Sequence, residues 1–306
     1  MRENIVITRN VTKKYINKFA VNNINMTIKE GDIYGLVGRN GAGKTTIIKM
    51  ITSLTDETSG EIELFGKVNK KERIKEHSRI GAIIETPMFF PKLSAKDNLE
   101  YYRIQKGIVE KDSVDKTLKI VGLDKTGNKK FRDFSLGMKQ RLGLALAILG
   151  NPDFLILDEP INGLDPMGIK EIRDILIELN RVKRTTILIS SHILSELSQL
   201  ATCYGFINNG VLIEELSAEE LEEKCRHHIS IKVDDSEKAS VVLEKLGCKS
   251  YDVLNGNNLR IYDFINEPYI VNSMLVKEGI KVYQLQRIGS NLEDYFLQLV
   301  GGDKNA

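Results

Sequence analysis

Apolar and polar positions follow two different periods along this chain. In the first two thirds, short runs of Ile, Leu and Val bounded by polar residues predict buried strands. These candidate strands are residues 5–11, 25–28, 33–37, 80–84, 154–157, 186–190 and 205–208. Amphipathic segments lie between them and predict helices. Because several of the strand runs are continuously apolar, we expect a largely parallel sheet that is buried on both faces.

Two further segments add to this α/β core. Residues 60–66 predict a hairpin strand on an antiparallel side sheet. Residues 95–150 favour helices, at about 95–106, 114–121 and 137–149. We therefore expect an α-helical insertion between two parts of the core.

The pattern changes after residue 216. A charged helix at 218–226 precedes elements in the order strand, helix, strand, strand, helix, strand, and a last helix is expected at 291–299. That order predicts a small ferredoxin-like α+β domain. We expect two domains, residues 1–216 and 217–306, and the second carries no recognisable chemistry, so its expected role is interaction or regulation.

Residues 38–46 carry the first chemical signal, Gly-Arg-Asn-Gly-Ala-Gly-Lys-Thr-Thr. They match the phosphate-binding loop pattern G-x-x-x-x-G-K-[ST] and lie between an expected strand and an expected helix. Glycines let backbone N–H groups surround a phosphate, and the helix N-terminus adds positive charge. A glycine-rich turn that matches by chance is the alternative. The predicted nucleotide-binding residues are Gly38, Arg39, Asn40, Gly41, Ala42, Gly43, Lys44, Thr45 and Thr46.

Within this loop, Lys44 is expected to reach the β- and γ-phosphates, and the Thr45 hydroxyl to ligate Mg²⁺. A second signal is the apolar strand at 154–157, which is followed by Asp158 and Glu159. Beside a phosphate loop, Asp158 is expected to hold Mg²⁺ and Glu159 to polarise the attacking water. A buried strand followed by a solvated acidic turn is the alternative.

Residues 134–141, Phe-Ser-Leu-Gly-Met-Lys-Gln-Arg, precede that acidic strand. Together they resemble the signature motif of ABC-type ATPases, whose usual form is Leu-Ser-Gly-Gly-Gln. Three positions differ from the usual form, but Ser135 and Gly137, the positions closest to phosphate in the family, are retained. The resemblance covers residues 4 to about 215. It implies a P-loop ABC-type ATPase core with the side sheet and helical insertion described above.

The resemblance assigns three more residues. Tyr15 is where an aromatic ring stacks on adenine, Asp165 is in a D-loop (Asn-Gly-Leu-Asp-Pro) that bridges two subunits, and His192 is where a switch histidine contacts the γ-phosphate. From the residues alone, each also fits a structural role: a half-buried strand tyrosine, a turn that starts a helix, and a histidine at a strand end. The implied catalytic residues are Lys44, Glu159 and His192.

Glu85 is a departure from the family, which normally has glutamine after this strand. That glutamine senses Mg²⁺ and nucleotide and passes their state to the membrane partner, here through residues 87–99. A carboxylate keeps the oxygen ligand and adds negative charge near metal and phosphate. Glu85 and residues 135–141 resemble the ATPase subunits of bacitracin-resistance and lantibiotic-immunity exporters. Drift at a tolerant position is the alternative.

The resemblance also implies partners and cofactors. ATP and Mg²⁺ are the expected cofactors, and a single set of motifs implies a head-to-tail homodimer that sandwiches nucleotide. No apolar stretch approaches the roughly 20 residues of a membrane span, so a separate permease is expected, with this chain on the inner face of the cell membrane. Net charge is +2, which argues against a nucleic-acid partner. The alternative is a soluble ABC-type ATPase that acts on the ribosome or DNA.

Overall fold

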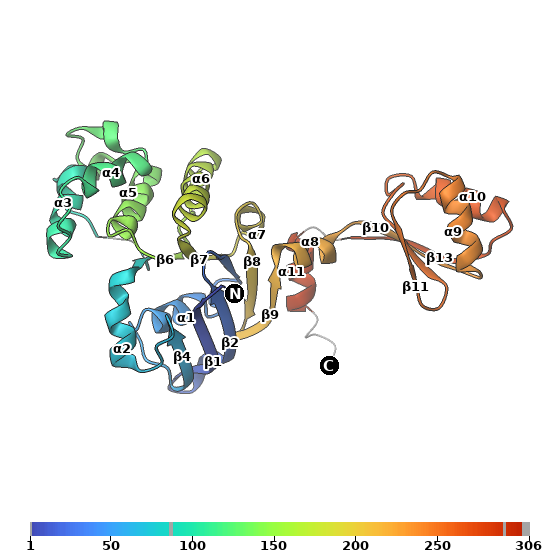
Figure 1. Cartoon of the computed structure of the whole chain (residues 1–306), viewed down its shortest axis with the longest axis horizontal. Helices are drawn as coiled ribbons and strands as arrows, with labels where there is room; N and C mark the ends of the chain where they lie inside the picture. The colour runs from blue at the N-terminus through green and yellow to red at the C-terminus, as the bar shows by residue number, and fades with distance from the viewer. Residues whose placement is uncertain (1, 86–87, 290–291, 302–306) are drawn as a thin grey trace. The chain divides into compact units, whose positions relative to one another are not determined.

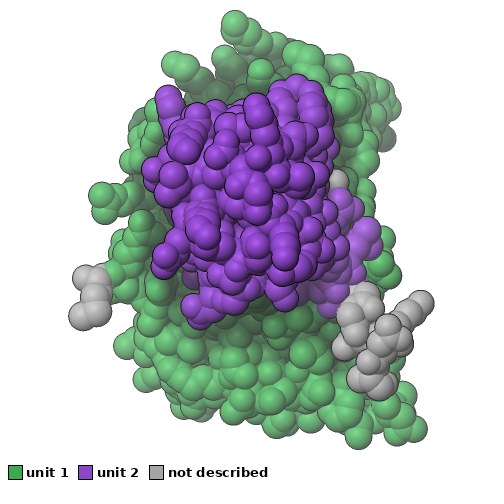
Figure 2. All heavy atoms as spheres, turned by 90° about the vertical axis from the view of Figure 1, so that its right-hand side faces the viewer, with its two compact units in different colours: residues 1–218 green, residues 219–306 purple. Residues whose placement is uncertain are grey.

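The computed structural model describes residues 2–85, 88–289 and 292–301. The chain divides into two compact units, residues 1–218 and 219–306, coloured green and purple in Figure 2. Residue 87, the first of the predicted coupling segment, lies outside the described residues, as does residue 291 at the start of the predicted last helix. Every helix in the described part of the chain is too short or too polar to cross a bilayer.

A six-stranded sheet with the order β5-β6-β7-β3-β8-β9 is the centre of the first unit (Figure 1). All its neighbouring strands are parallel except β9, which is antiparallel to β8. The strands β3 and β7 are buried at every position, which confirms the expectation from their apolar runs. The six strands span Ile33–Val37 (β3), Ile80–Ile83 (β5), Phe154–Asp158 (β6), Thr186–Ser191 (β7), Cys203–Asn208 (β8) and Val211–Ser217 (β9).

An antiparallel side sheet with the order β2-β1-β4 confirms the predicted one. Its strands span Asn4–Tyr15 (β1), Lys18–Lys29 (β2) and Ser59–Leu64 (β4). Strands β1 and β2 are longer than the apolar runs that predicted them. They pair with each other as one hairpin, and this pairing continues through exposed positions. One hydrophobic core joins residues of both sheets and of helix α1, Lys44–Ile51. Helix α1, which follows the phosphate loop, is thus held in place by packing against both sheets.

The carboxylate of Glu215 links the two sheets. The Tyr34 hydroxyl on β3 donates a hydrogen bond to Glu215 Oε1 on β9 at 2.7 Å, and the backbone N–H of Thr27 on β2 donates to the same oxygen at 3.2 Å. Burial raises the pKa of the Glu215 carboxyl above its usual value. A Cβ at Gly205 would lie 2.1 Å from the Tyr34 hydroxyl, so this position must be glycine for the tyrosine to fit.

The predicted helical insertion is present, and α3, α4 and α5 lie together away from the side sheet (Figure 1). Ser94 and Asp97 form a capping box at the start of α3, and Ser135 caps α5. The helices of this unit are α2 (Lys70–Lys75), α3 (Ala95–Gln105), α4 (Ser113–Ile120), α5 (Leu136–Ile148), α6 (Pro166–Lys183) and α7 (Leu194–Leu197). Short 3₁₀ turns lie at Glu76–Arg79, Asp124–Thr126 and Phe131–Asp133.

The second unit contains a four-stranded antiparallel sheet with the order β11-β12-β10-β13. Its first and third strands are central and its second and fourth are at the edges, which is the ferredoxin-like arrangement that the element order predicted. A separate core of Ile, Leu and Val side chains lies between this sheet and α9 and α10. The elements are α8 (Ala218–Cys225), β10 (His228–Val233), α9 (Ser236–Lys245), β11 (Tyr251–Leu254), β12 (Asn258–Ile261), α10 (Pro268–Lys277), β13 (Val282–Ile288) and α11 (Leu292–Gly301).

Candidate nucleotide site

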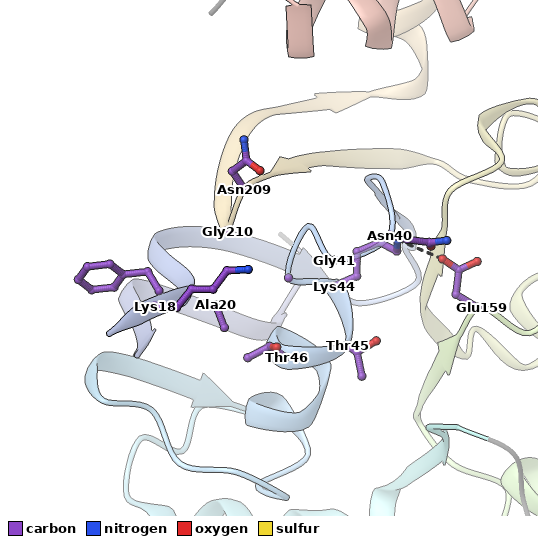
Figure 3. A pocket seen from close by; sticks show the side chains of 12 residues that line it. Lys18, Ala20, Asn40, Gly41, Lys44, Thr45, Thr46, Glu159, Asn209 and Gly210 are labelled. Atoms are coloured by element: carbon purple, nitrogen blue, oxygen red, sulfur yellow. Dashed lines mark ion pairs between the residues drawn. The ribbon is translucent and has the colours of Figure 1, made fainter. Parts of the chain in front are cut away.

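The phosphate loop runs from the end of β3 to the start of α1 and lines a hollow of about 370 Å³, the phosphate-loop hollow (Figure 3). Two of its glycines are required by the space around them. A Cβ at Gly38 would lie 2.5 Å from the Ile207 carbonyl oxygen, and one at Gly43, whose φ is +114°, would lie 2.7 Å from the Ala20 carbonyl oxygen. The predicted residues that line the hollow are Asn40, Gly41, Gly43, Lys44, Thr45, Thr46 and Glu159.

Lys44 is nearly buried, and its ammonium group lies inside the loop. It donates to the Gly38 carbonyl oxygen at 2.7 Å and lies 3.1 Å from Glu159 Oε1, the ion pair drawn dashed in Figure 3. Arg39 is exposed and offers a second carbonyl oxygen to Lys44 at 3.3 Å, whereas Ala42 is buried below the loop. The ammonium is therefore held at the base of the hollow, with backbone carbonyls on one side and a carboxylate on the other.

Asp158 and Glu159, at the end of β6, connect the loop to β7. The Thr45 hydroxyl donates to Asp158 Oδ2 at 2.6 Å, and the Ser190 hydroxyl of β7 donates to Asp158 Oδ1 at 2.6 Å. Ser190 also accepts a hydrogen bond from the backbone N–H of Glu159 at 2.9 Å. The second Glu159 oxygen lies 2.8 Å from His192 Nδ1, which carries the proton because an ionised carboxylate only accepts. The structure thus brings Lys44, Thr45, Asp158, Glu159 and His192 into one connected network.

Glu85 lies at the end of β5 and forms an ion pair with Lys49 of α1, with 2.6 Å between its Oε1 and the lysine Nζ. The hydrogen bond and the charge of Lys49 lower the pKa of the Glu85 carboxyl, and Glu85 raises the pKa of Lys49. Glu85 is also one of the few non-glycine residues with left-handed backbone, at φ +66°. Sequence reasoning selected Glu85 but not its lysine partner.

Ser135, Gly137 and Asp165 are not in the phosphate-loop hollow. They line a second hollow of about 430 Å³, the signature hollow, together with Gly163 and Arg141. Ser135 Oγ accepts from the Met138 N–H at 3.3 Å, and Asp165 Oδ1 accepts from the Gly168 N–H at 3.2 Å. These bonds start α5 and α6, so two helix N-termini, each with partial positive charge, meet at this hollow.

Tyr15 lies at the end of β1, half exposed, with Lys13 Nζ 5.1 Å from its ring centre. It does not line the phosphate-loop hollow, whose aromatic side chain is Phe19 on the neighbouring strand β2. The adenine-stacking role of Tyr15 therefore stays a prediction.

Comparison with known proteins identifies the family. The sequence model of the ABC transporter family matches residues 21–162. The bacitracin transport ATP-binding protein BcrA of Enterococcus faecalis is 44% identical over 98% of this chain and 97% of its own length. The chain belongs to the ABC transporter ATP-binding proteins. As a member of this family, it binds and hydrolyses ATP and forms part of a membrane transporter.

Two further similarities refine this assignment. The lantibiotic transport ATP-binding protein SrtF of Streptococcus pyogenes is 43% identical, but the match covers 72% of this chain and 96% of that relative. Among solved structures, a dimeric ATP-binding cassette in a post-hydrolysis state with ADP and Pi is 26% identical, with a TM-score of 0.63 over 70% of this chain and 98% of that one. The ABC cassette fold is thus that of the first unit.

Sequence reasoning missed several residues of this ABC site. Lys18, Phe19 and Ala20 of β2 line the phosphate-loop hollow, as do Asn209 and Gly210 in the β8–β9 turn, which Figure 3 places across from the loop. The Asn-Gly pair is a strong hairpin signal that could have located this turn. Ser190 had a weaker signal, a polar residue at the end of an apolar strand, and nothing in its own segment connected it to Asp158.

Proposed function

We propose that this chain is the ATP-hydrolysing subunit of an exporter for antimicrobial peptides of the bacitracin type. The observation that carries the peptide class is the match along the full length. The E. faecalis bacitracin relative matches nearly all of this chain, including the second unit. The lantibiotic relative matches over 96% of its own length but only 72% of this chain. It is therefore too short to contain counterparts of both units at their full length here. Lantibiotics are therefore the second candidate cargo, and the comparisons give no support to a role on ribosomes or DNA.

The proposed catalytic roles follow from the hydrogen-bond network. We expect Lys44, which donates to the Gly38 carbonyl oxygen, to neutralise the γ-phosphate of bound ATP together with the N–H groups at the start of α1. Glu159 contacts Lys44 and His192. Of the two carboxylates Asp158 and Glu159, we expect Glu159 to orient and deprotonate the attacking water. His192 fixes the direction of Glu159 through its Nδ1–H. Ser190 positions both acidic residues from the neighbouring strand.

The donors present fit a Mg²⁺ ion bound with the nucleotide. The Thr45 hydroxyl and the Asp158 carboxylate are hard oxygen ligands that already touch each other. No group of three or more Asp, Glu, His or Cys side chains in the described ranges could hold a metal ion. We expect phosphate oxygens and water to complete the coordination. Bound there, Mg²⁺ would neutralise negative charge on the phosphates. Glu85 is the third proposed oxygen ligand.

Catalysis by a head-to-tail homodimer is supported by the separation of the two hollows. The predicted signature residues Ser135 and Gly137 line a different hollow from the phosphate loop. A second copy of the chain is needed to place these helix N-termini against the nucleotide held at residues 38–46. Asp165, which lines the signature hollow, would then also lie at the interface between the two copies.

Coupling to a permease is supported by apolar side chains that follow Glu85 in the sequence. Met88 is 85% exposed and Ile104 is 65% exposed, and the half-exposed rings of Phe90 and Tyr101 pack together with 4.8 Å between their centres. These exposed apolar side chains, on α3 and the segment before it, are suited to pack against a cytoplasmic loop of a membrane protein. We expect the chain to bind the permease there, on the inner face of the membrane.

Peptide resistance of a susceptible host tests the proposal. The chain is expressed with the membrane protein that co-purifies with it from its native cell, and growth is measured against bacitracin and against a lantibiotic. We expect bacitracin resistance that Lys44→Ala abolishes. Resistance to the lantibiotic alone would move the cargo to the second class. Recovery of the chain only from soluble fractions, without a membrane protein, would contradict the transporter role.

A further inference from the structure

Glu85 and Glu159 occupy matching places at the ends of two neighbouring strands. Ile83 of β5 pairs with Leu157 of β6, and each glutamate lies two residues beyond its strand's member of that pair. Both have left-handed backbone, at φ +66° for Glu85 and +50° for Glu159. This conformation is unfavourable for a residue with a Cβ and persists only where the surroundings hold it. Each carboxylate is therefore placed by contacts of its own.

Helix α1 supplies one lysine to each of these carboxylates. Lys44 lies 3.1 Å from Glu159 Oε1, and Lys49 lies 2.6 Å from Glu85 Oε1. Lys49 is four residues after Thr45, so the two residues share one face of the helix, about 6 Å apart along its axis. Glu85 is thus paired with the lysine one helical turn after Thr45, whose hydroxyl is proposed above as a metal ligand.

A carboxylate at position 85 would be repelled by a bound triphosphate unless a cation accompanied it. Lys49 supplies that cation in this structure. Lys49 contacts Glu85 Oε1. Its ammonium would repel a second cation at the same carboxylate, so the lysine and Mg²⁺ compete electrostatically for Glu85. A glutamine at this position would offer an uncharged oxygen and would have much less need of the lysine.

We propose that Lys49 is a positioning residue for Glu85, and that the Lys49–Glu85 ion pair is a latch that Mg²⁺ must open to bind with nucleotide. This inference rests on the proposed function, because it takes the Mg²⁺–ATP site as given. With Mg²⁺ bound, Glu85 would exchange its lysine partner for the metal, and the contact that holds this residue, two positions after β5, would be lost. Lys49 thereby makes the release of Glu85 depend on bound Mg²⁺, and not on nucleotide alone.

The affinity of the isolated chain for a fluorescent non-hydrolysable ATP analogue tests the latch, without reference to hydrolysis. The measured quantity is the ratio of the dissociation constant in EDTA to that in Mg²⁺. Lys49→Gln frees Glu85 from its competitor, so we expect this ratio to rise by about two- to five-fold, as for the loss of one partly exposed ion pair. In the Glu85→Gln background, the same lysine substitution should leave the ratio unchanged.

Two controls separate the latch from a purely structural ion pair. Lys49→Arg keeps the charge and should keep the ratio near that of the wild type. Lys96→Gln breaks a pair with 2.6 Å between Lys96 Nζ and Asp115 Oδ1, outside the lining of both hollows, and should not change the ratio. An unchanged or lower ratio in Lys49→Gln, or an equal change with and without Glu85, would overturn the latch while leaving the ATPase assignment intact. A wild-type chain that binds no nucleotide in either condition would contradict the proposed function and the latch together.

Discussion

The phosphate-loop hollow and the signature hollow are similar in volume, about 370 and 430 Å³, but their polar groups differ in kind. In the first, Lys44 and Glu159 face each other and connect to Asp158 and His192 through one network. In the second, Ser135 and Asp165 cap the helices on which they lie. The first hollow therefore holds the side chains proposed to react, Lys44 and Glu159, beside the N-terminus of α1, whereas the second lies at the N-termini of α5 and α6.

This difference explains why a single chain has the residues for hydrolysis and still requires a second copy. The reactive side chains belong to the sheet edge formed by β3, β6 and β7. The stabilising helix ends belong to α5 and α6. Because both sets are fixed by their own elements, a partner must bring one set to the other. The following predictions test whether the two hollows divide the work in this way.

Removal of the reactive carboxylate should have the largest effect. Glu159→Gln keeps the shape of the side chain and one oxygen for His192, but it cannot accept the proton of the attacking water. We expect ATP hydrolysis, measured as phosphate release, to fall by about 10²- to 10⁴-fold. Binding of the fluorescent ATP analogue should persist, and ATP should now stabilise a dimer in light scattering. Hydrolysis within tenfold of the wild type would remove Glu159 from the catalytic role.

A block in the signature hollow should have a smaller effect on hydrolysis and should act only across the dimer. Ser135→Arg fills the hollow, so we expect hydrolysis to fall about 10²-fold, as when one preorganised group near the transition state is lost. Nucleotide binding to the isolated chain should stay within about twofold, because Ser135 does not line the phosphate-loop hollow.

Mixing this variant with Lys44→Ala gives a sharper form of the same test. In a head-to-tail dimer, one composite site of the mixed pair has both substitutions and the other has neither. The mixture should therefore regain part of the hydrolysis that both variants lack alone. A mixture as inactive as its components would argue against composite sites, provided that light scattering shows the mixed dimer.

Substitutions of two glycines should have the smallest effects, and they should separate an effect on chain stability from an effect on hydrolysis. Gly43→Ala forces a Cβ to within 2.7 Å of the Ala20 carbonyl at φ +114°, so we expect it to destabilise the chain by about 1–3 kcal/mol. Gly137→Ala meets only Leu164 Cδ2, at 3.9 Å, inside α5, and should stabilise the chain slightly, by less than about 1 kcal/mol. Thermal unfolding measures both effects. Hydrolysis by Gly137→Ala should nevertheless fall about tenfold or more, because the new methyl group keeps the partner's phosphate away. A destabilised Gly137→Ala would mean that this glycine serves the chain's own packing.

Much of the fold could be predicted from local patterns. The continuous apolar runs at β3 and β7 correctly indicated strands buried on both faces, and the element order of the second unit indicated its ferredoxin-like sheet. The strand β9 was not predicted as an element of its own. Its sequence, Val-Leu-Ile-Glu-Glu-Leu-Ser, follows neither a strict alternation nor a continuous apolar run, and Leu216 is its one buried residue. Such elements depend on neighbours that the local sequence does not reveal.

The sequence by itself determined the chemistry of the phosphate-loop hollow. A glycine loop, its lysine and threonine, and an acidic pair after an apolar strand are local features, because each is set by a few consecutive residues and the backbone they require. Only the tertiary structure decided which side chains meet. Ser190 reaches Asp158 across 32 residues, and Lys49 reaches Glu85 across 36. Parallel strands align the ends of distant segments at one edge, and helix α1 lies beside that edge. Contacts of this kind depend on strand order and register, which single-segment patterns do not contain.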